Sequence, residues 1–173
     1  RLQPDDPTSE IPTYSHIKFL AVDSDRGSLA PDGQNWDLDI NSEFFEISSG
    51  DINGLLAQTK VLSNMPQFRW LKNSEEDQSG LSILSAEAGA GGVRQIGRLL
   101  IVEKSVDFVH KLEQYISAAK EGLPEGSDVS VHIFAGLGGG TGSGTFLDVC
   151  YLVQEALAHM GEAGHAQTLG YFF

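Results

Sequence analysis

The sequence predicts an α/β protein in which a mostly parallel β-sheet packs against helices. Residues 129–135 combine β-branched residues with apolar alternation, which is typical of a strand, and residues 146–160 have the apolar spacing of a helix packed on one side. A run that is nearly all glycine joins them. Residues 17–22 are apolar at almost every position, as expected of a strand that is covered on both faces. These observations together predict the fold class.

The glycine run at residues 136–145 is predicted to form a phosphate-binding loop. Glycine has no Cβ, so its backbone can adopt φ > 0 and approach a ligand closely. Consecutive N–H groups in such a turn form a concave anion-binding nest, and the helix that follows adds unpaired N–H groups and the positive end of its dipole. A glycine-rich surface turn is the alternative, but long glycine runs are costly to order, which favours a role in ligand approach.

Two common phosphate-binding patterns do not fit this run. A Walker-type loop needs a lysine, and residues 121–173 contain none. A dinucleotide fingerprint needs glycines at positions i, i+2 and i+5. In each register of the run the last of these positions holds a hydroxyl residue, namely Thr141, Ser143 or Thr145. The run therefore indicates a different class of phosphate loop.

Two more segments carry candidate site residues. The triplet Asp23-Ser24-Asp25 follows the first predicted strand, at the carboxyl end where open α/β sheets place ligands. A second glycine cluster, at residues 89–92, precedes a predicted helix with an apolar side made of Ile96, Leu99, Leu100, Val106, Val109, Leu112 and Ile116.

The order of these segments and the motif Gly-Gly-Gly-Thr-Gly-Ser-Gly at 138–144 resemble those of the tubulin superfamily, which includes the bacterial division protein FtsZ. The Gly-Ala-Gly-Gly cluster at 89–92 resembles the loop that contacts the terminal phosphate in the bacterial branch of that superfamily. The wording Arg-Gln-Ile-Gly-Arg at 94–98 is closer to bacterial tubulin-like-domain proteins than to tubulin or FtsZ themselves. The resemblance covers residues 17–173.

The resemblance implies a three-layer sandwich with a mostly parallel, Rossmann-like sheet of the tubulin nucleotide-binding type, incomplete in this chain. It implies GTP or GDP as the ligand, with the phosphates held by backbone amides and hydroxyls of Gly138, Gly139, Gly140, Thr141, Gly142 and Ser143. The terminal phosphate would be contacted by Gly89, Ala90, Gly91 and Gly92.

Asp23 and Asp25 are the candidate ligands of Mg²⁺. The family has an Asn-Thr-Asp-like triplet near the phosphates and the metal, and this chain has Asp23 at the first position. A Mg²⁺-facing role and a turn that caps the strand are equally good interpretations of the triplet.

The resemblance implies part of a bacterial tubulin-like GTP-binding protein, which forms filaments in which a neighbouring subunit completes a hydrolytic site. No residue in the segment is a good general base, so GTPase activity is left open. A non-hydrolysing, nucleotide-bound scaffold for partner proteins is the alternative function. An NAD-binding oxidoreductase with an atypical loop ranks below both, because the dinucleotide spacing fails.

We expect a single partial nucleotide-binding domain over residues 1–173, with an irregular lead-in at 1–16 and a variable region at 26–80. In the superfamily a mid-sheet strand precedes the segment that matches residue 17. Its loss would leave about ten backbone groups without partners, at about 1–3 kcal/mol each if buried. Because a domain is stable by only about 5–15 kcal/mol, we expect the chain to be a fragment of a longer polypeptide.

Composition limits the partners and the location. The net charge is −13, from 24 acidic and 11 basic residues, which disfavours nucleic acid because such partners mostly need a basic surface. No run of about 18 apolar residues is present, so no membrane span is predicted. The first residues lack the pattern of a secretory signal, and the single cysteine excludes an internal disulfide. These features favour a cytoplasmic protein.

Three side chains have more than one interpretation. Arg94 could reach a phosphate or a neighbouring subunit, or it could cover the helix surface; both readings remain open. Arg98 is predicted to lie on that surface and to pair with Glu87 or Glu103. Cys150 is predicted to be a small buried apolar residue rather than a reactive thiol.

The region at 26–80 gives two further predictions. A short strand is predicted at residues 44–47, where Phe44-Phe45-Glu-Ile47 is mostly apolar, and a short helix at residues 52–62. Neither is assigned any chemistry.

Overall fold

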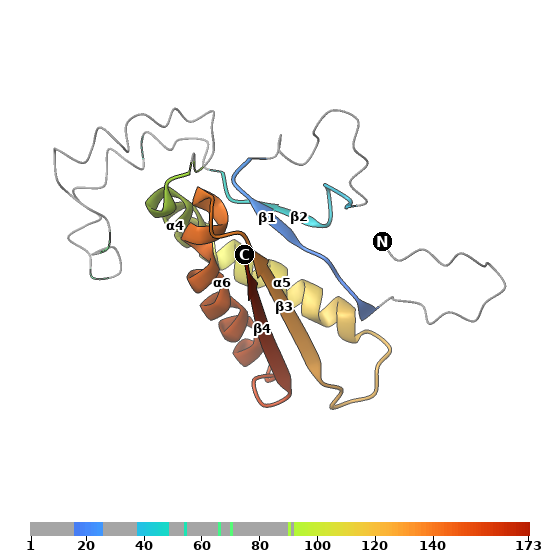
Figure 1. Ribbon diagram of the computed structural model, residues 1–173. Coiled ribbons are helices and arrows are strands. Elements are labelled where there is room, and N and C mark those ends of the chain that lie inside the picture. Colours follow the sequence, from blue (N-terminus) through green and yellow to red (C-terminus); the bar gives the residue numbers. More distant parts are fainter. Residues whose placement is uncertain are drawn as a thin grey trace.

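The computed structural model of the chain describes residues 16–25, 38–48, 54, 66, 70, 90 and 92–173 (Figure 1). This part of the chain contains both helices and parallel strands, which confirms the predicted α/β class. In chain order the elements are β1 (Ala21–Asp23), β2 (Phe44–Glu46), α4 (Arg94–Glu103), α5 (Ser105–Lys120), β3 (Val129–Ala135), α6 (Gly140–His159) and β4 (Ala166–Phe172).

The four strands form two separate parallel pairs. In the first pair β1 lies beside β2, with Ala21 opposite Phe44. In the second pair β3 lies beside β4, and an unbroken register runs from Val129 opposite Ala166 to Ala135 opposite Phe172. The connection from β3 to β4 runs through α6, as a parallel crossover requires. The predicted parallel strands at 129–135 and 44–47 are thus present, whereas the predicted strand at 17–22 is a strand only from Ala21.

Three helices lie along these strands (Figure 1). Between the helices and the strands are two apolar clusters. In the first cluster α4 and the start of α5 pack on β1 and β2, through Ile96, Leu100, Ile101, Phe108 and Ile47. In the second cluster α5 and α6 pack on β3 and β4, through Val109, Ile116, Val153, Ala156 and Leu157. Because α5 contributes to both clusters, it ties the two strand pairs together.

The other face of β3 and β4 carries exposed aromatic side chains. Phe134 is 66% exposed and Tyr171 is 42% exposed. Their rings stack at a centroid distance of 4.6 Å, and His132 stacks on the other side of Tyr171 at 5.8 Å. The described helices therefore cover one face of this strand pair and leave the opposite, partly apolar face open.

The predicted helix after the second glycine cluster is two helices. It breaks at Lys104, whose φ and ψ of −93° and 9° are not helical. The break shifts the apolar periodicity, because the register of α4 does not continue into α5. Val106, predicted on the apolar side, is consequently 67% exposed, whereas Phe108 is 1% exposed.

Helix α6 begins six residues earlier than the apolar pattern predicted. Its first residue is Gly140, so much of the predicted loop is helix. Glycine disfavours a helix interior by about 1 kcal/mol, which is why the pattern indicated a loop. The glycines are accommodated because α4 crosses α6 closely here: a Cβ added to Gly144 would collide with the backbone carbonyl of Arg94, and one added to Gly97 with that of Gly140.

The structure places two side chains whose surroundings were predicted from the sequence. Cys150 is half-buried on α6, and burial raises the pKa of its thiol, which disfavours the reactive thiolate. Arg98 lies on the surface as predicted and pairs with Asp148 of α6. Of its two predicted partners, Glu103 makes no ion pair with it, and Glu87 lies outside the described residues. The predicted helix at 52–62 falls almost wholly outside the residues that the structure describes. None of the described helices is long and apolar enough to cross a lipid bilayer.

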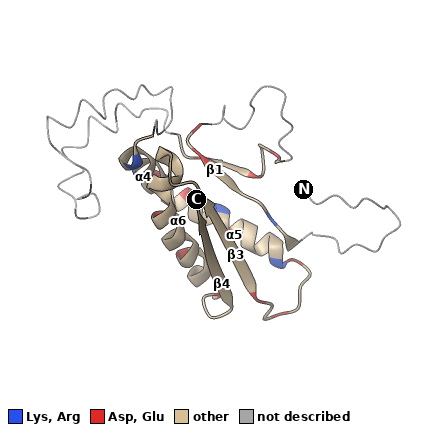
Figure 2. Ribbon diagram, viewed as in Figure 1, with Lys and Arg blue, Asp and Glu red and all other residues tan. Residues whose placement is uncertain are grey.

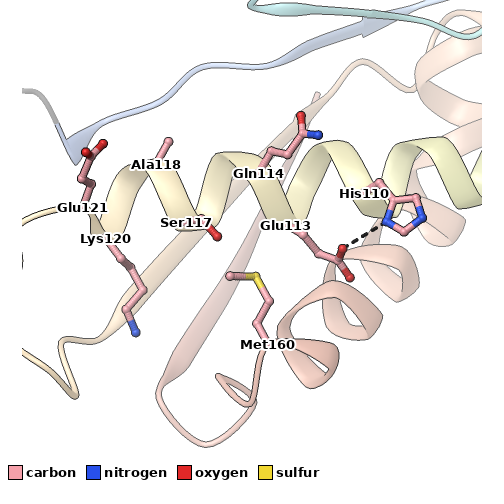
Figure 3. A pocket seen from close by; sticks show the side chains of 8 residues that line it. All are labelled: His110, Glu113, Gln114, Ser117, Ala118, Lys120, Glu121 and Met160. Atoms are coloured by element: carbon pink, nitrogen blue, oxygen red, sulfur yellow. Dashed lines mark hydrogen bonds and ion pairs between the residues drawn. The ribbon is translucent and has the colours of Figure 1, made fainter.

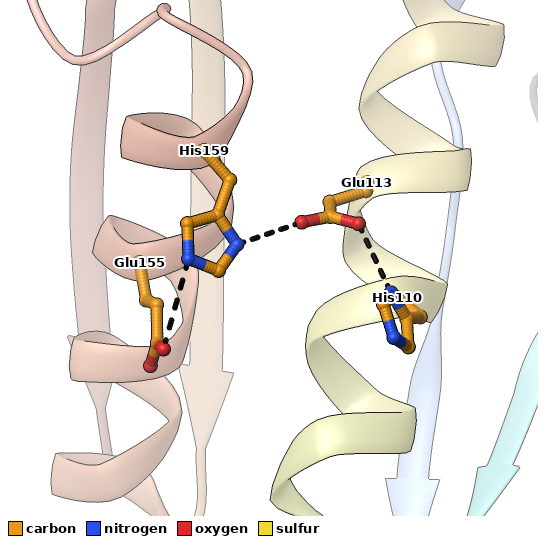
Figure 4. A network of polar contacts seen from close by, with 4 residues as sticks. All are labelled: His110, Glu113, Glu155 and His159. Atoms are coloured by element: carbon orange, nitrogen blue, oxygen red, sulfur yellow. Dashed lines mark hydrogen bonds and ion pairs between the residues drawn. The ribbon is translucent and has the colours of Figure 1, made fainter.

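A polar network joins the middle of α5 to the C-terminal end of α6 (Figure 4). The Glu113 carboxylate on α5 bonds to His159 Nδ1 on α6 at 2.9 Å and to His110 Nδ1 at 3.2 Å. Glu155 lies 3.9 Å from the other nitrogen of His159. Nearby, Lys120 of α5 pairs with Glu162, which follows α6. Hydrogen bonds from His159 and then His110 lower the pKa of Glu113.

We expect the α4–α6 crossing to be intolerant of a single added methyl group. Gly144→Ala should lower the free energy of unfolding by about 1–3 kcal/mol, because the new Cβ meets backbone atoms of Arg94 and Arg98 that cannot rotate away. Urea denaturation of the full chain measures this change. Gly164→Ala is the control, since nothing lies within 4 Å of its added Cβ; equal midpoints for the two variants would contradict the crossing.

We expect the network at Glu113 to make stability depend on pH. The folded-state pKa is lowered from the ordinary 4.5, so the carboxylate contributes stability above that value and loses it as the pH falls through the folded pKa. Glu113→Gln should therefore lower the urea midpoint most at pH 6 and progressively less below pH 4.5. Glu155→Gln is the control, since its contact is longer. A midpoint difference that is the same at every pH would refute this role.

Candidate functional site

The site is built on the turn that joins β3 to α6. The turn comprises only residues 136–139, because α6 begins at Gly140. The Leu137 N–H donates to the Phe173 carbonyl oxygen at 2.7 Å, which continues the β3–β4 ladder into the turn. The N-cap residue Gly139 makes no side-chain cap, and the first turn of α6 has no acidic residue. The first N–H groups of a helix have no partner within the helix, so they are available to an acceptor.

The glycines of this turn and helix differ in the space around them. Among the described residues, an added Cβ at Gly138 or Gly139 would meet no atom within 4 Å, and neither residue has a positive φ. An added Cβ at Gly140 would lie 2.7 Å from Val93 N, and one at Gly142 would collide with the Gly136 carbonyl. Packing therefore explains Gly140 and Gly142, whereas neither packing nor backbone conformation explains Gly138 and Gly139.

The triplet after β1 touches the first turn of α6. Ser24 Oγ lies 2.9 Å from Thr141 Oγ1, and Thr141 Oγ1 also lies 3.4 Å from Asp23 Oδ1. The same Asp23 oxygen accepts the backbone N–H groups of Ser24 at 2.6 Å and of Asp25 at 3.2 Å. These backbone bonds make the triplet a turn that caps β1, and its contact with Thr141 places the Asp23 carboxylate beside α6.

The second glycine cluster joins the same site. The Ala90 N–H donates to Ser24 Oγ at 3.0 Å, and Ala90 is 2% exposed. Gly92 adopts φ of 82°, the left-handed conformation that favours glycine, and leads into α4. Gly89 and Gly91 lie outside the described residues. The structure thus brings together the three segments that the sequence analysis singled out, at Ser24, Ala90 and Thr141.

Ser24 is the residue that sequence reasoning missed. It is 5% exposed, and its hydroxyl is the point at which the three segments meet. Its place between two aspartates drew attention to the carboxylates instead. The signal that could have found it is a hydroxyl residue at the end of a buried strand, since a buried hydroxyl needs hydrogen-bond partners.

The hydroxyl of Ser143, predicted to hold phosphate, donates to the Gly139 carbonyl oxygen at the start of α6. This is a bond back to the previous turn, of the kind that serine forms in helices. In the structure the two candidate hydroxyls of α6 are thus both occupied, Thr141 by Ser24 and Ser143 by its own helix.

No cationic side chain comes from the turn itself, and Figure 2 shows the described lysines and arginines elsewhere. Both bonds of the Arg98 guanidinium to Asp148 are short, at 2.9 and 3.2 Å, and the group also lies 4.6 Å from the centre of the Trp70 ring. The Arg94 side chain is exposed, and within the described part of the chain it makes no hydrogen bond or ion pair. Backbone amides and the α6 dipole are therefore the positive groups of the turn.

Carboxylates for a metal ion are few. Within the described residues no group of three or more His, Cys, Asp or Glu side chains is arranged to hold a metal. Asp23 and Asp25 are the two carboxylates of the triplet, and Asp23 is the one that contacts Thr141. Mg²⁺ commonly takes one or two carboxylates and completes its shell with phosphate oxygens and water, so the two aspartates fit a metal that arrives with a phosphate ligand.

A wide hollow lies at the opposite end of the helices (Figure 3). It has a volume of about 1030 Å³, and its lining includes Glu113, Lys120 and Met160. Met160 follows the 20 residues of α6, so this hollow is about 30 Å from Gly140. It shares no residue with the three converging segments, and its open, mixed lining has no pattern that predicts a ligand.

Comparison with known protein families gives one match. The model of a family described as tubulin-like matches residues 9–173, nearly the whole chain. No curated protein and no solved structure matches significantly. The order of β3, the glycine turn and α6 is the one that the resemblance implied, and the family model spans all three. This chain belongs to the tubulin-like family.

Proposed function

We propose that the chain binds the phosphates of a guanine nucleotide, GTP or GDP, at the turn between β3 and α6. The observation that carries the proposal is the open space at Gly138 and Gly139. Glycine there is required neither by packing nor by φ, so close approach of a ligand to the backbone is the remaining physical reason for it. The amides of the turn and the N-terminus of α6 suit an anion.

The remaining candidate residues support the same ligand. Gly140, Thr141, Gly142 and Ser143 form the first turn of α6, where N–H groups point out of the helix. Ala90 and Gly92 lie against Gly140, so the second glycine cluster borders the same turn. We propose that Gly89 to Gly92 contact the terminal phosphate, as the family resemblance implies.

Mg²⁺ is part of this proposal. The Asp23 carboxylate lies beside Thr141, where it would repel a bare phosphate. A divalent cation between carboxylate and phosphate removes that repulsion, and Asp23 with Asp25 would hold it. The cation would neutralise phosphate charge, while the chain supplies backbone donors.

The finer architecture is proposed to be a three-layer sandwich with a mostly parallel, Rossmann-like sheet. Parallel sheets are almost always covered on both faces. The exposed stack of Phe134 and Tyr171 supports a second layer, because it is an apolar surface of the kind that a helix covers.

We propose further that the protein is bacterial and cytoplasmic, and that it self-associates into filaments in which a neighbouring subunit completes hydrolysis. Membership of the tubulin-like family supports self-association. No residue of the segment is a good candidate for the general base, so the neighbouring subunit would supply it. Measuring phosphate release by the full chain separates the two functions: release supports a GTPase, and bound nucleotide without release supports a scaffold.

Replacing Gly139 by valine should remove nucleotide binding while the fold persists. The side chain would occupy the space that a phosphate needs, so the GTP affinity measured by isothermal titration calorimetry with Mg²⁺ should fall at least tenfold. Because Gly139 is the N-cap, stability should fall by only about 1 kcal/mol. Gly138→Val should behave alike without changing the cap.

Gly164→Val is the matched control, since it adds the same side chain in open space on another turn. Its GTP affinity should equal that of the unmodified chain. Gly140 is unsuitable for this test, because its added Cβ meets Val93 N at 2.7 Å and would act through packing. Unchanged affinity in both Gly138 and Gly139 variants would rule out this phosphate site.

A further inference from the structure

We infer that Ser24 is a positioning residue that links the second glycine cluster to the bound phosphate through a directed hydrogen-bond chain. The chain runs from the Ala90 N–H to the Ser24 hydroxyl, then to the Thr141 hydroxyl, then to a phosphate oxygen. The inference rests on the proposed function, because its last acceptor is the nucleotide. In this view Ser24 orients the Thr141 hydroxyl that contacts the phosphate.

The hydrogen-bonding capacity of a hydroxyl fixes the possible arrangements. Each hydroxyl has one proton to donate and two lone pairs that accept. Ala90 N–H uses one lone pair of Ser24 Oγ at 3.0 Å. The Ser24 proton then points to Thr141 Oγ1 at 2.9 Å or to Asp23 Oδ1 at 3.4 Å. Thr141 has the same choice between Ser24 and Asp23, whose Oδ1 is also 3.4 Å away.

Two proton arrangements therefore satisfy the group without a ligand. In one, Ser24 donates to Thr141 and Thr141 donates to Asp23. In the other, Thr141 donates to Ser24 and Ser24 donates to Asp23. The three side chains thus form a closed triangle of hydrogen bonds around one carboxylate oxygen. That oxygen also keeps the two backbone donors of its own turn, from Ser24 and Asp25.

A bound phosphate selects one arrangement. Phosphate oxygens accept hydrogen bonds, so Thr141 must turn its proton to the ligand. Thr141 Oγ1 can then only accept from Ser24, and the Ser24 proton is fixed toward it. All donors in the chain point the same way, and bonds in such chains strengthen one another. Asp23 loses one weak donor but keeps its two backbone donors, so its carboxylate stays in place.

This arrangement makes Ala90 sensitive to occupancy of the phosphate site. The Ala90 amide is buried, and its acceptor is the same hydroxyl that orients Thr141. When phosphate binds, the arrangement in which Thr141 also donates to Ser24 is lost. Ser24 Oγ then accepts only from the Ala90 N–H, so the Ala90 amide is held more tightly. The ligand thereby restrains Ala90 without any contact between Ala90 and phosphate.

The test uses the full chain with Ser24→Ala, Thr141→Val and the double variant. We measure the affinity for GTP with Mg²⁺ and the hydrogen exchange of the Ala90 amide with and without saturating nucleotide. Each single variant should bind GTP about three- to tenfold more weakly, which is the range for one lost hydrogen bond. The double variant should bind no more weakly than Thr141→Val alone, because the chain passes through Thr141. Two losses that simply multiply would refute the chain.

Hydrogen exchange separates positioning from a merely structural role. In the unmodified chain, GTP should slow exchange of the Ala90 amide at least threefold. In Thr141→Val, saturating GTP should leave that exchange rate unchanged, although Ser24 is still present. Ser24→Thr, which keeps a hydroxyl, should restore the effect that Ser24→Ala removes. Slowing that persists in Thr141→Val would overturn the inference.

A matched control variant shows whether the effects are specific to Ser24 and Thr141. The possible failures also distinguish the inference from the proposed function. Ser130→Ala removes an exposed hydroxyl at the other end of β3, and it should change neither affinity nor exchange. If Ser24→Ala does not fold, Thr141→Val alone still decides through the Ala90 exchange rate. If the unmodified chain binds no GTP, the proposed function fails and the inference falls with it. If it binds GTP but the affinity losses of the two single variants multiply in the double variant, only the inference falls.

Discussion

One buried hydroxyl, that of Ser24, joins three segments that are far apart in the sequence. Its oxygen accepts a hydrogen bond from the Ala90 N–H and lies within hydrogen-bond distance of the Thr141 hydroxyl. The backbone N–H of Ser24 also donates to the Asp23 carboxylate. A buried hydroxyl without partners would be unfavourable by about 1–3 kcal/mol, so the three segments must stay together for the strand end to remain buried. The position of Asp23 beside the first turn of α6 follows from this requirement.

The second constraint is the closeness of the helix backbones. Side chains would normally separate two helices by 8–10 Å, whereas glycines at 97, 140 and 144 let α6 approach α4 until backbone atoms face each other. The same approach presses Gly140 against Ala90 and Val93, which fixes the direction in which the N-terminus of α6 points. An acidic chain can therefore present a positive helix end and backbone donors at a defined place without a lysine in the turn.

Much of this could be predicted from the sequence. The strands at 129–135 and 44–47, the apolar helix after the glycine run and the family were all readable, because alternation and helical spacing leave a strong trace. The start of α6 was not, since glycine counts against a helix until its neighbour across the crossing is known. The break at Lys104 was also missed, because the apolar residues on either side of it are compatible with one long helix. Ser24 required three-dimensional contacts between positions 24, 90 and 141, which no local pattern contains.

The neighbouring glycines of the run lie in two different kinds of surroundings. Gly140 and Gly142 are confined by the protein itself, whereas Gly138 and Gly139 face open space. Under the proposed function, a relative that does not bind nucleotide would be free to diversify at 138 and 139 while keeping 140 and 142. Residue identity at that one pair of positions would then distinguish members that still hold an anion from those that only retain the shape.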